Sequence, residues 1–315
     1  MKRQKHRFIQ YLEYFGALTL AVPFYLLPRK LAFRAGEQIG ELMYRTMRRR
    51  RQIGDTNLSI AFGDALSDQE KARILRSTFR NLGKSLVELL HFPKMSKAYL
   101  QEKVQIVGQE NYLAAMRKGK GMIYLTAHIG NWEMSSHAQS AAGYPLNIVV
   151  RPLDNPLLDK MVTKLRTLHG NTVLTRGHGL KQILAALRKK QAVGILMDQN
   201  TLRSRGIFVE FFGKPACTIP VIALLALRYD VPVIPGFIVR TGFDTHALHL
   251  GPEIEIQRTG DTQRDIAANT ARFNQIIEDF IRRYPDQWFW IHNRWKTQPR
   301  NAERSELFDE NRKMY

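Results

Sequence analysis

The sequence predicts an α/β fold with a mixed, largely parallel sheet flanked by helices. Short apolar runs alternate with amphipathic helical segments between residues 122 and 197, as in parallel strands joined by crossover helices. The chain has 315 residues, 44% of them hydrophobic, which is enough to bury a sizeable core. We predict three parts: an N-terminal membrane-anchoring helix within residues 1–30, one domain over 31–299, and a polar tail over 300–315.

The first part begins with basic residues and continues as an uncharged run over residues 14–28. As a helix these 15 residues cover about 22 Å, less than the roughly 30 Å hydrocarbon core, so a full span would have to bury Glu13. Pro23 and the lack of a small-residue cleavage pattern argue against a signal peptide, while a buried core helix is the other alternative. Basic flanks favour an anchor that either spans with a tilt or lies in the interface.

Two helices are predicted next. Apolar residues recur at helical spacing over 31–47, which predicts the first helix. The four arginines of 48–51 follow it, and three roles are open for them: a solvated face, contact with an anionic leaflet, or a grip on substrate phosphates. Ser67 and Glu70 form a capping box that begins the second helix. Its apolar stripe either packs in the core or lines an acyl-chain groove.

The domain that follows is built from strands and helices in alternation. The predicted strands cover residues 122–125, 146–150, 172–174, 192–197, 207–212, 231–239 and 248–256. The predicted helices begin at Asn131 and cover 156–168, 180–188, 219–229 and 265–283. Sites in such folds lie at the carboxyl ends of parallel strands, where Arg151, Arg176 and Asp198 fall.

The turn between residues 121 and 133 concentrates the chemistry. His128 follows a short apolar strand, and Asn131 is a plausible N-cap for a helix whose first turn contains Glu133. Residues five apart on one continuous helix would diverge by about 140°, so a His128–Glu133 pair requires the loop that Gly130 permits. In that geometry Glu133 accepts a hydrogen bond from His128 and leaves the other ring nitrogen free as a general base. A plain loop hydrogen bond is the alternative.

The net charge and the motifs of the sequence restrict the kinds of molecule that the protein is expected to bind. A net charge of +20 indicates an anionic partner: nucleic acid, anionic lipid or an acidic carrier protein. The sequence contains no nucleic-acid-binding signature, no Gly-rich phosphate loop and no histidine or cysteine spacing typical of zinc, so we predict no nucleic acid, no nucleotide or other cofactor and no metal. The single cysteine, Cys217, is interpreted as a small buried residue.

The turn, within Ala-His-Ile-Gly-Asn-Trp-Glu, resembles the signature of the late acyltransferases of lipid A biosynthesis, the lauroyl and myristoyl transferases of the lysophospholipid acyltransferase group. Four further blocks follow in that family's order, over residues 149–156, 197–200, 211–216 and 292–297. Asn293 and Gln298 stand where the family pattern has basic residues. The likeness covers most of the chain up to about residue 299.

The resemblance implies a glycerol-3-phosphate acyltransferase-like sandwich and an enzyme that moves a fatty acyl chain from acyl carrier protein to a hydroxyl of a lipid A precursor. It implies His128 and Glu133 as catalytic residues and a place at the cytoplasmic face of the bacterial inner membrane, on an anionic membrane surface. Among the substrate-binding candidates, Arg151 is placed to grip an anionic group, or is an ordinary strand-end arginine.

The other substrate-binding candidates are Asn131, Asp198 and Arg294, with Asp198 favoured as an organiser of loops over a cation ligand. Three interpretations are open for the tryptophans of residues 288–295: they pack in the core, lie at a membrane interface, or close the acceptor pocket. Two alternatives remain: an acyltransferase for a glycerolipid or a mannosylated phosphoinositide, and a non-catalytic protein that binds anionic membranes or lipid.

Overall fold

The computed structural model describes residues 7–175 and 179–300. Arg176, the basic residues Lys2, Arg3 and Lys5, and the tail from residue 301 onward lie outside the described residues. Within the described part, seven strands form one sheet in the order β1-β9-β8-β2-β5-β3-β4. The strands are β1 (Val104–Val107), β2 (Met122–Thr126), β3 (Leu146–Val150), β4 (Thr172–Thr175), β5 (Ala192–Leu196), β8 (Val233–Arg240) and β9 (His246–Leu250).

The sheet is mixed and largely parallel, as predicted. Strand β2 pairs in parallel with both β5 and β8, and β3 pairs in parallel with β4 and β5. The exception is the antiparallel pair of β8 and β9, whose partner β1 runs parallel to β9. The carboxyl ends of β2, β5 and β3 therefore meet at one edge of the sheet, where ligand sites of such folds lie.

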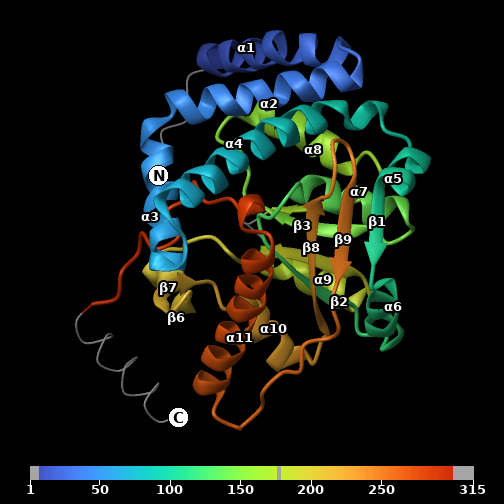
Figure 1. The fold of residues 1–315 in the computed structure, drawn as a ribbon. Coiled ribbons are helices and arrows are strands. Elements are labelled where there is room, and N and C mark those ends of the chain that lie inside the picture. Colours follow the sequence, from blue (N-terminus) through green and yellow to red (C-terminus); the bar gives the residue numbers. More distant parts are fainter. Residues whose placement is uncertain (1–6, 176–178, 301–315) are drawn as a thin grey trace.

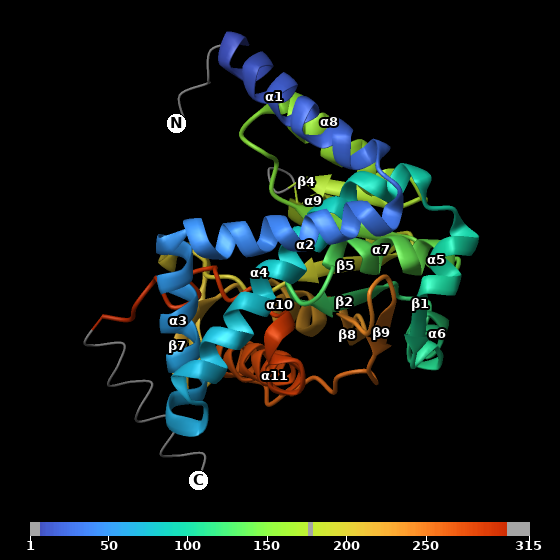
Figure 2. The same cartoon turned by 45° about the horizontal axis from the view of Figure 1, so that its top comes forward.

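Helices cover both faces of the sheet (Figures 1 and 2). They are α1 (Arg7–Leu26), α2 (Arg29–Thr46), α3 (Arg48–Phe62), α4 (Asp68–His91), α5 (Lys97–Lys103), α6 (Gln109–Arg117), α7 (Trp132–Ala141), α8 (Pro156–Thr167), α9 (Gly179–Arg188), α10 (Val221–Tyr229) and α11 (Thr262–Arg283). Short 3₁₀ turns stand at η1 (Gly63–Ala65), η2 (Phe92–Lys94), η3 (Arg203–Arg205) and η4 (Pro285–Gln287).

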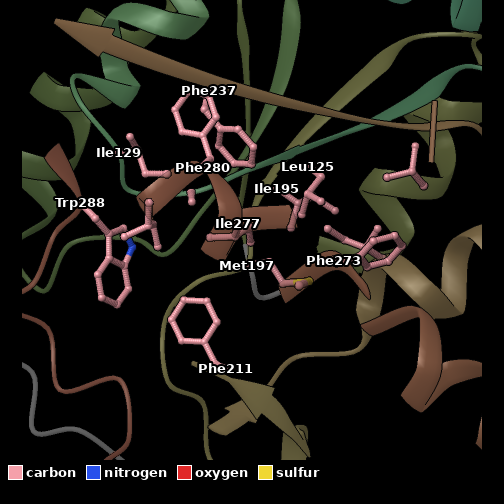
Figure 3. Packing of buried hydrophobic residues seen from close by; sticks show 14 of the residues in the cluster. Leu125, Ile129, Ile195, Met197, Phe211, Phe237, Phe273, Ile277, Phe280 and Trp288 are labelled. Carbon is pink, nitrogen blue, oxygen red and sulfur yellow. The ribbon is translucent and has the colours of Figure 1, made fainter. Parts of the chain in front are cut away.

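The alternation of side chains along β2 divides the core into two clusters. Ile123 and Leu125 face the cluster that contains α11, whereas Met122 and Tyr124 face the cluster that contains α7. Figure 3 shows the first cluster, in which Leu125 and Ile195 of neighbouring strands pack near Ile277 of α11. This two-sided burial is why the strands are continuous apolar runs.

The N-terminal helices lie over one side of the domain. Helices α2 and α4 approach closely, because a Cβ on Gly40 would lie 2.3 Å from the carbonyl oxygen of Phe79 and one on Gly83 would lie 2.1 Å from that of Gly36. Helix α1 lies outside them, next to α8 in Figure 2, and none of its residues is buried. Across residues 7–175 and 179–300, no helix combines the length and apolarity that crossing a bilayer requires.

Several boundaries differ from the prediction for identifiable reasons. The strand predicted over 248–256 ends at Leu250, because Gly251 and Pro252 interrupt it. The strand predicted over 207–212 is half of a hairpin: β6 (Ile207–Phe211) turns through Phe212 and Gly213, both with positive φ, into β7 (Lys214–Thr218). Strand β1 and helices α3, α5 and α6 were not predicted; the arginines of residues 48–51 begin α3.

Candidate active site

His128 lies in the loop between β2 and α7, as predicted. The segment that follows α11 fixes this loop: Phe289 donates its backbone N–H to the carbonyl of His128 at 3.0 Å, and Gly130 donates to the carbonyl of Gln287 at 2.8 Å. Helix α7 then begins with Asn131 as its N-cap, whose side-chain oxygen accepts from the backbone N–H of Met134 at 3.1 Å. Sequence reasoning therefore placed the loop and the cap correctly.

Gly130 allows the turn. Its φ is +57°, and a Cβ at this position would lie 2.3 Å from the carbonyl oxygen of Ile238 in β8. Only glycine satisfies both the left-handed backbone and this close approach without displacing the neighbouring strand.

The carboxylate that holds the imidazole belongs to Asp198. Its Oδ1 lies 2.8 Å from Nδ1 of His128, and its Oδ2 accepts the backbone N–H of the same residue at 3.0 Å. Asp198 is 1% exposed. Burial raises the pKa of Asp198, but the nearby His128 and the hydrogen bonds that the carboxylate accepts from His128 and Trp288 outweigh burial and lower this pKa to about 2. The carboxylate is thus ionised at neutral pH and accepts the Nδ1–H, which leaves Nε2 as the basic nitrogen.

The topology explains why these two residues meet. Thr126 and Leu196 are paired in the parallel β2–β5 ladder, so the chain leaves both strands at the same level. His128 and Asp198 each follow two residues later. A carboxylate placed directly after a fully apolar strand was the sequence signal for this contact.

Trp288 and Gln199 complete the surroundings of this pair. Trp288, from the segment after α11, donates its indole N–H to Oδ2 of Asp198 at 2.7 Å. The side-chain nitrogen of Gln199 lies 3.2 Å from Nε2 of His128. The ring of Trp132 packs edge-on against the imidazole, with centroids 4.9 Å apart. His128 keeps 18% of its side chain exposed.

Glu133 does not make the predicted hydrogen bond to His128. Arg166 of α8 binds it instead, with Nε within 3.1 Å of both carboxylate oxygens and Nη2 on Oε1. The physical reason is that a guanidinium offers two donors in the geometry of a carboxylate, whereas Nδ1 of His128 faces the β5 side and is taken by Asp198. The expected geometry of the pair is therefore corrected: Asp198 occupies the position predicted for Glu133.

The residues predicted to bind substrate lie in different surroundings. Arg151 follows β3 with 64% of its side chain exposed, 4.0 Å from Asp154. Asn131 and Arg294 are 2% and 0% exposed. Asn131 also donates to Glu88, and Arg294 donates to the carbonyl of Cys217 at 3.0 Å and to Thr218. Both side chains are thus buried and bonded within the protein, and a contact of either with substrate stays a prediction.

The remaining aromatic and thiol candidates are buried. Trp288, Trp290 and Trp295 are at most 4% exposed, which confirms core packing, and Cys217 is fully buried as expected. His292, which sequence reasoning did not assign, accepts the backbone N–H of Asn200 at 3.2 Å through Nε2. Burial lowers the pKa of His292 to about 4, although the charge of Asp198 acts to raise it. His292 is therefore neutral at pH 7.

Comparison with known proteins gives one consistent result. The family model described as bacterial lipid A biosynthesis acyltransferase matches residues 1–297. The chain is 28% identical over 286 residues to the lipid A biosynthesis lauroyltransferase of Escherichia coli, with 90% of each chain covered. It is 27% identical over 266 residues to the palmitoleoyltransferase of the same organism, with 84% of each covered. A Haemophilus influenzae lipid A biosynthesis acyltransferase is 26% identical over 284 residues, covering 89% of this chain and 85% of the relative. With its fold, its His128 loop and this match over most of its length, the chain belongs to the bacterial lipid A biosynthesis acyltransferases.

Proposed function

We propose that this protein transfers a fatty acyl chain from acyl carrier protein to the hydroxyl of a 3-hydroxyacyl chain on a lipid A precursor. The observation that carries the proposal is the His128–Asp198 pair, at 2.8 Å, in a family of lipid A acyltransferases. The pair occupies Nδ1 and leaves Nε2 of His128 as the basic atom, which is what deprotonation of a hydroxyl requires. No protein nucleophile is needed, because the acceptor supplies the attacking oxygen.

The steps follow from this arrangement. Nε2 of His128 takes the proton of the acceptor hydroxyl as its oxygen attacks the thioester carbonyl, and the side chain of Gln199 gives way to the hydroxyl. The tetrahedral intermediate expels the carrier thiolate, which receives the proton from the imidazolium, leaving a new ester and a free carrier thiol. Asp198 stays ionised throughout and stabilises the imidazolium.

Glu133 takes a different place in this scheme. Its side chain is 14% exposed and that of Arg166 18%, so the pair is mostly buried but reachable from solvent next to the His128 loop. We assign Glu133 the task of holding the guanidinium of Arg166 in one orientation, where it meets an anionic group of the acceptor.

A reconstituted reaction tests this function. Purified protein, a lipid A precursor and acyl carrier protein carrying a defined chain are combined, and the lipid is analysed by mass spectrometry. The expected result is a mass increase of one acyl chain. Equal rates with the coenzyme A thioester would refute dependence on the carrier, and transfer to a lysophospholipid but not to lipid A would favour the glycerolipid alternative. Vesicle binding without transfer to any acceptor would favour a non-catalytic lipid-binding protein.

Helix α1 is proposed to lie in the membrane interface. Phe8, Leu12, Phe15, Val22 and Leu26 follow one face of the helix, and each is between 43% and 68% exposed. A continuous outward apolar face of this kind is stable when it is buried among lipid chains. Together with the net charge of +20, it supports attachment to an anionic surface, which we place at the cytoplasmic face of the inner membrane.

The attachment predicts the effect of polar substitutions. Replacing Leu12, Phe15 and Leu26 with serine is expected to weaken binding to vesicles of anionic phospholipid at least about tenfold, because three apolar side chains no longer enter the bilayer. Co-sedimentation measures this. A matched control replaces Val107 and Leu113, which are exposed on β1 and α6, with serine. Equal binding of both variants would contradict the role of α1.

Arg151 gives a prediction about the acceptor. Its exposed side chain at the end of β3 is available to an anionic group of the lipid A precursor. Because lysine keeps the charge but loses the planar fork, Arg151→Lys is expected to raise the KM for the lipid acceptor more than the KM for the acyl donor. Steady-state kinetics with each substrate varied in turn is the measurement. Equal changes in both constants would remove Arg151 from the acceptor site.

A further inference from the structure

A buried ion pair joins α4 to β8 close to the His128 loop. Glu88 accepts from both terminal nitrogens of Arg240, with Oε1 at 2.7 Å from Nη1 and Oε2 at 2.6 Å from Nη2. The two side chains are 1% and 6% exposed. Two charges taken out of water in this way add little net stability, since desolvation opposes their attraction. The role of the pair is therefore sought in the groups that it holds in place.

The ion pair reaches the catalytic loop through Asn131. The side-chain nitrogen of Asn131 donates to Oε2 of Glu88 at 2.7 Å, while its oxygen caps the backbone N–H of Met134. Burial raises the pKa of Glu88, but the charge of Arg240 and the hydrogen bonds to the carboxylate leave that pKa below its usual value. Glu88 is thus a charged acceptor, and it sets the orientation of the Asn131 amide.

A second connection links Arg240 to the same loop through Gln287. Gln287 accepts the backbone N–H of Arg240 through Oε1 at 2.7 Å and donates through Nε2 to the carbonyl of Arg240 at 3.0 Å. Its own carbonyl accepts the N–H of Gly130. The contacts close a ring that runs from Gly130 through Gln287, Arg240 and Glu88 to Asn131. We call this ring the loop clamp.

We propose that Glu88 is a positioning residue for acyl transfer: with Arg240 it holds Asn131, and so keeps Nε2 of His128 where the acceptor hydroxyl is delivered. The clamp holds both residues of the Gly130–Asn131 peptide, which directly follows Ile129 and begins two residues after His128. A shift of this peptide moves the start of α7 and the imidazole together. The inference rests on the proposed role of His128 as the base.

Asn131→Ser is the most selective test. Serine is as good an N-cap as asparagine, so α7 stays capped, but its side chain is too short to reach Glu88. The expected result is a kcat about tenfold to a hundredfold lower, because a small displacement of a catalytic group is costly. Both KM values are expected to stay within about twofold, since no substrate contact is removed.

A double variant tests Glu88 itself. Glu88→Gln alone would leave Arg240 charged, buried and unpaired, so Glu88→Leu is combined with Arg240→Met, which removes both charges at similar volume. A folded protein with the kcat loss of Asn131→Ser is expected, and adding Asn131→Ser to it should cost little more, because the residues act as one unit. Wild-type kcat in the Asn131→Ser variant or in the Glu88→Leu, Arg240→Met double variant, at unchanged KM, would overturn the proposal.

Two controls separate positioning from stability and from the chemistry. Asp265 lies in the first turn of α11, is 3% exposed and accepts from the backbone N–H and the hydroxyl of Thr259. The His128 loop contacts the segment that follows the other end of this helix. Asp265→Asn is expected to lower the Tm without changing kcat below that Tm; an equal kcat loss at a matched Tm would make the clamp merely structural. Full activity of His128→Ala would instead refute the base, whatever the clamp does.

Discussion

Replacing His128 with alanine is expected to lower kcat by about 10²-fold to 10⁴-fold, the usual contribution of a positioned general base. The fold should survive, because the loop is also held by backbone hydrogen bonds from Phe289 and from Gly130 to Gln287. Turnover with acyl carrier protein and lipid A precursor, together with circular dichroism and the Tm, checks both statements.

A matched variant controls for the loss of an imidazole. His249 on β9 packs against Phe280 and Tyr284 within the domain and contacts neither Asp198 nor His128. His249→Ala is expected to keep near-normal kcat. A folded His128→Ala protein with full activity would end the proposed mechanism and favour the non-catalytic lipid-binding alternative.

Replacing Asp198 with asparagine is expected to lower kcat by a comparable factor, about 10²-fold to 10⁴-fold, without loss of substrate affinity. Oδ2 of Asp198 already accepts two N–H groups, from the His128 backbone and from Trp288. In the variant the single amide oxygen must stay with these donors, so the amide nitrogen faces Nδ1 of His128. The imidazole then carries its proton on Nε2, which is the wrong tautomer for a base.

Glu133→Gln distinguishes the two carboxylates. Since Glu133 binds Arg166, its amide variant is expected to raise the KM for the lipid acceptor and to lower kcat far less than Asp198→Asn does. The double variant His128→Ala with Asp198→Asn should be little worse than His128→Ala alone, because the two act together. If Glu133→Gln abolished turnover while Asp198→Asn remained active, the assignment of Asp198 would be wrong.

The sequence by itself determined the elements that local patterns encode. Alternation of apolar runs and helices predicted the α/β sheet, the capping box placed the start of α4 at Ser67, and the apolar strand before His128 gave the strand, loop and helix of the active site. These features depend on residues close in the chain, where periodicity, caps and glycine conformations act directly. The family resemblance, which the family match confirms, added the lipid A substrate class.

Only the tertiary structure decided which groups pair. His128 and Asp198 are 70 residues apart, and their contact depends on β5 lying next to β2 in register. Glu133, near His128 in sequence, turns instead to Arg166 of α8, which offers two donors. The Glu88–Arg240 pair spans 152 residues. Spacing in a sequence constrains neighbours on one element, whereas strand order and helix packing determine which distant charges share a buried space, and desolvation then requires each of them to find a partner there.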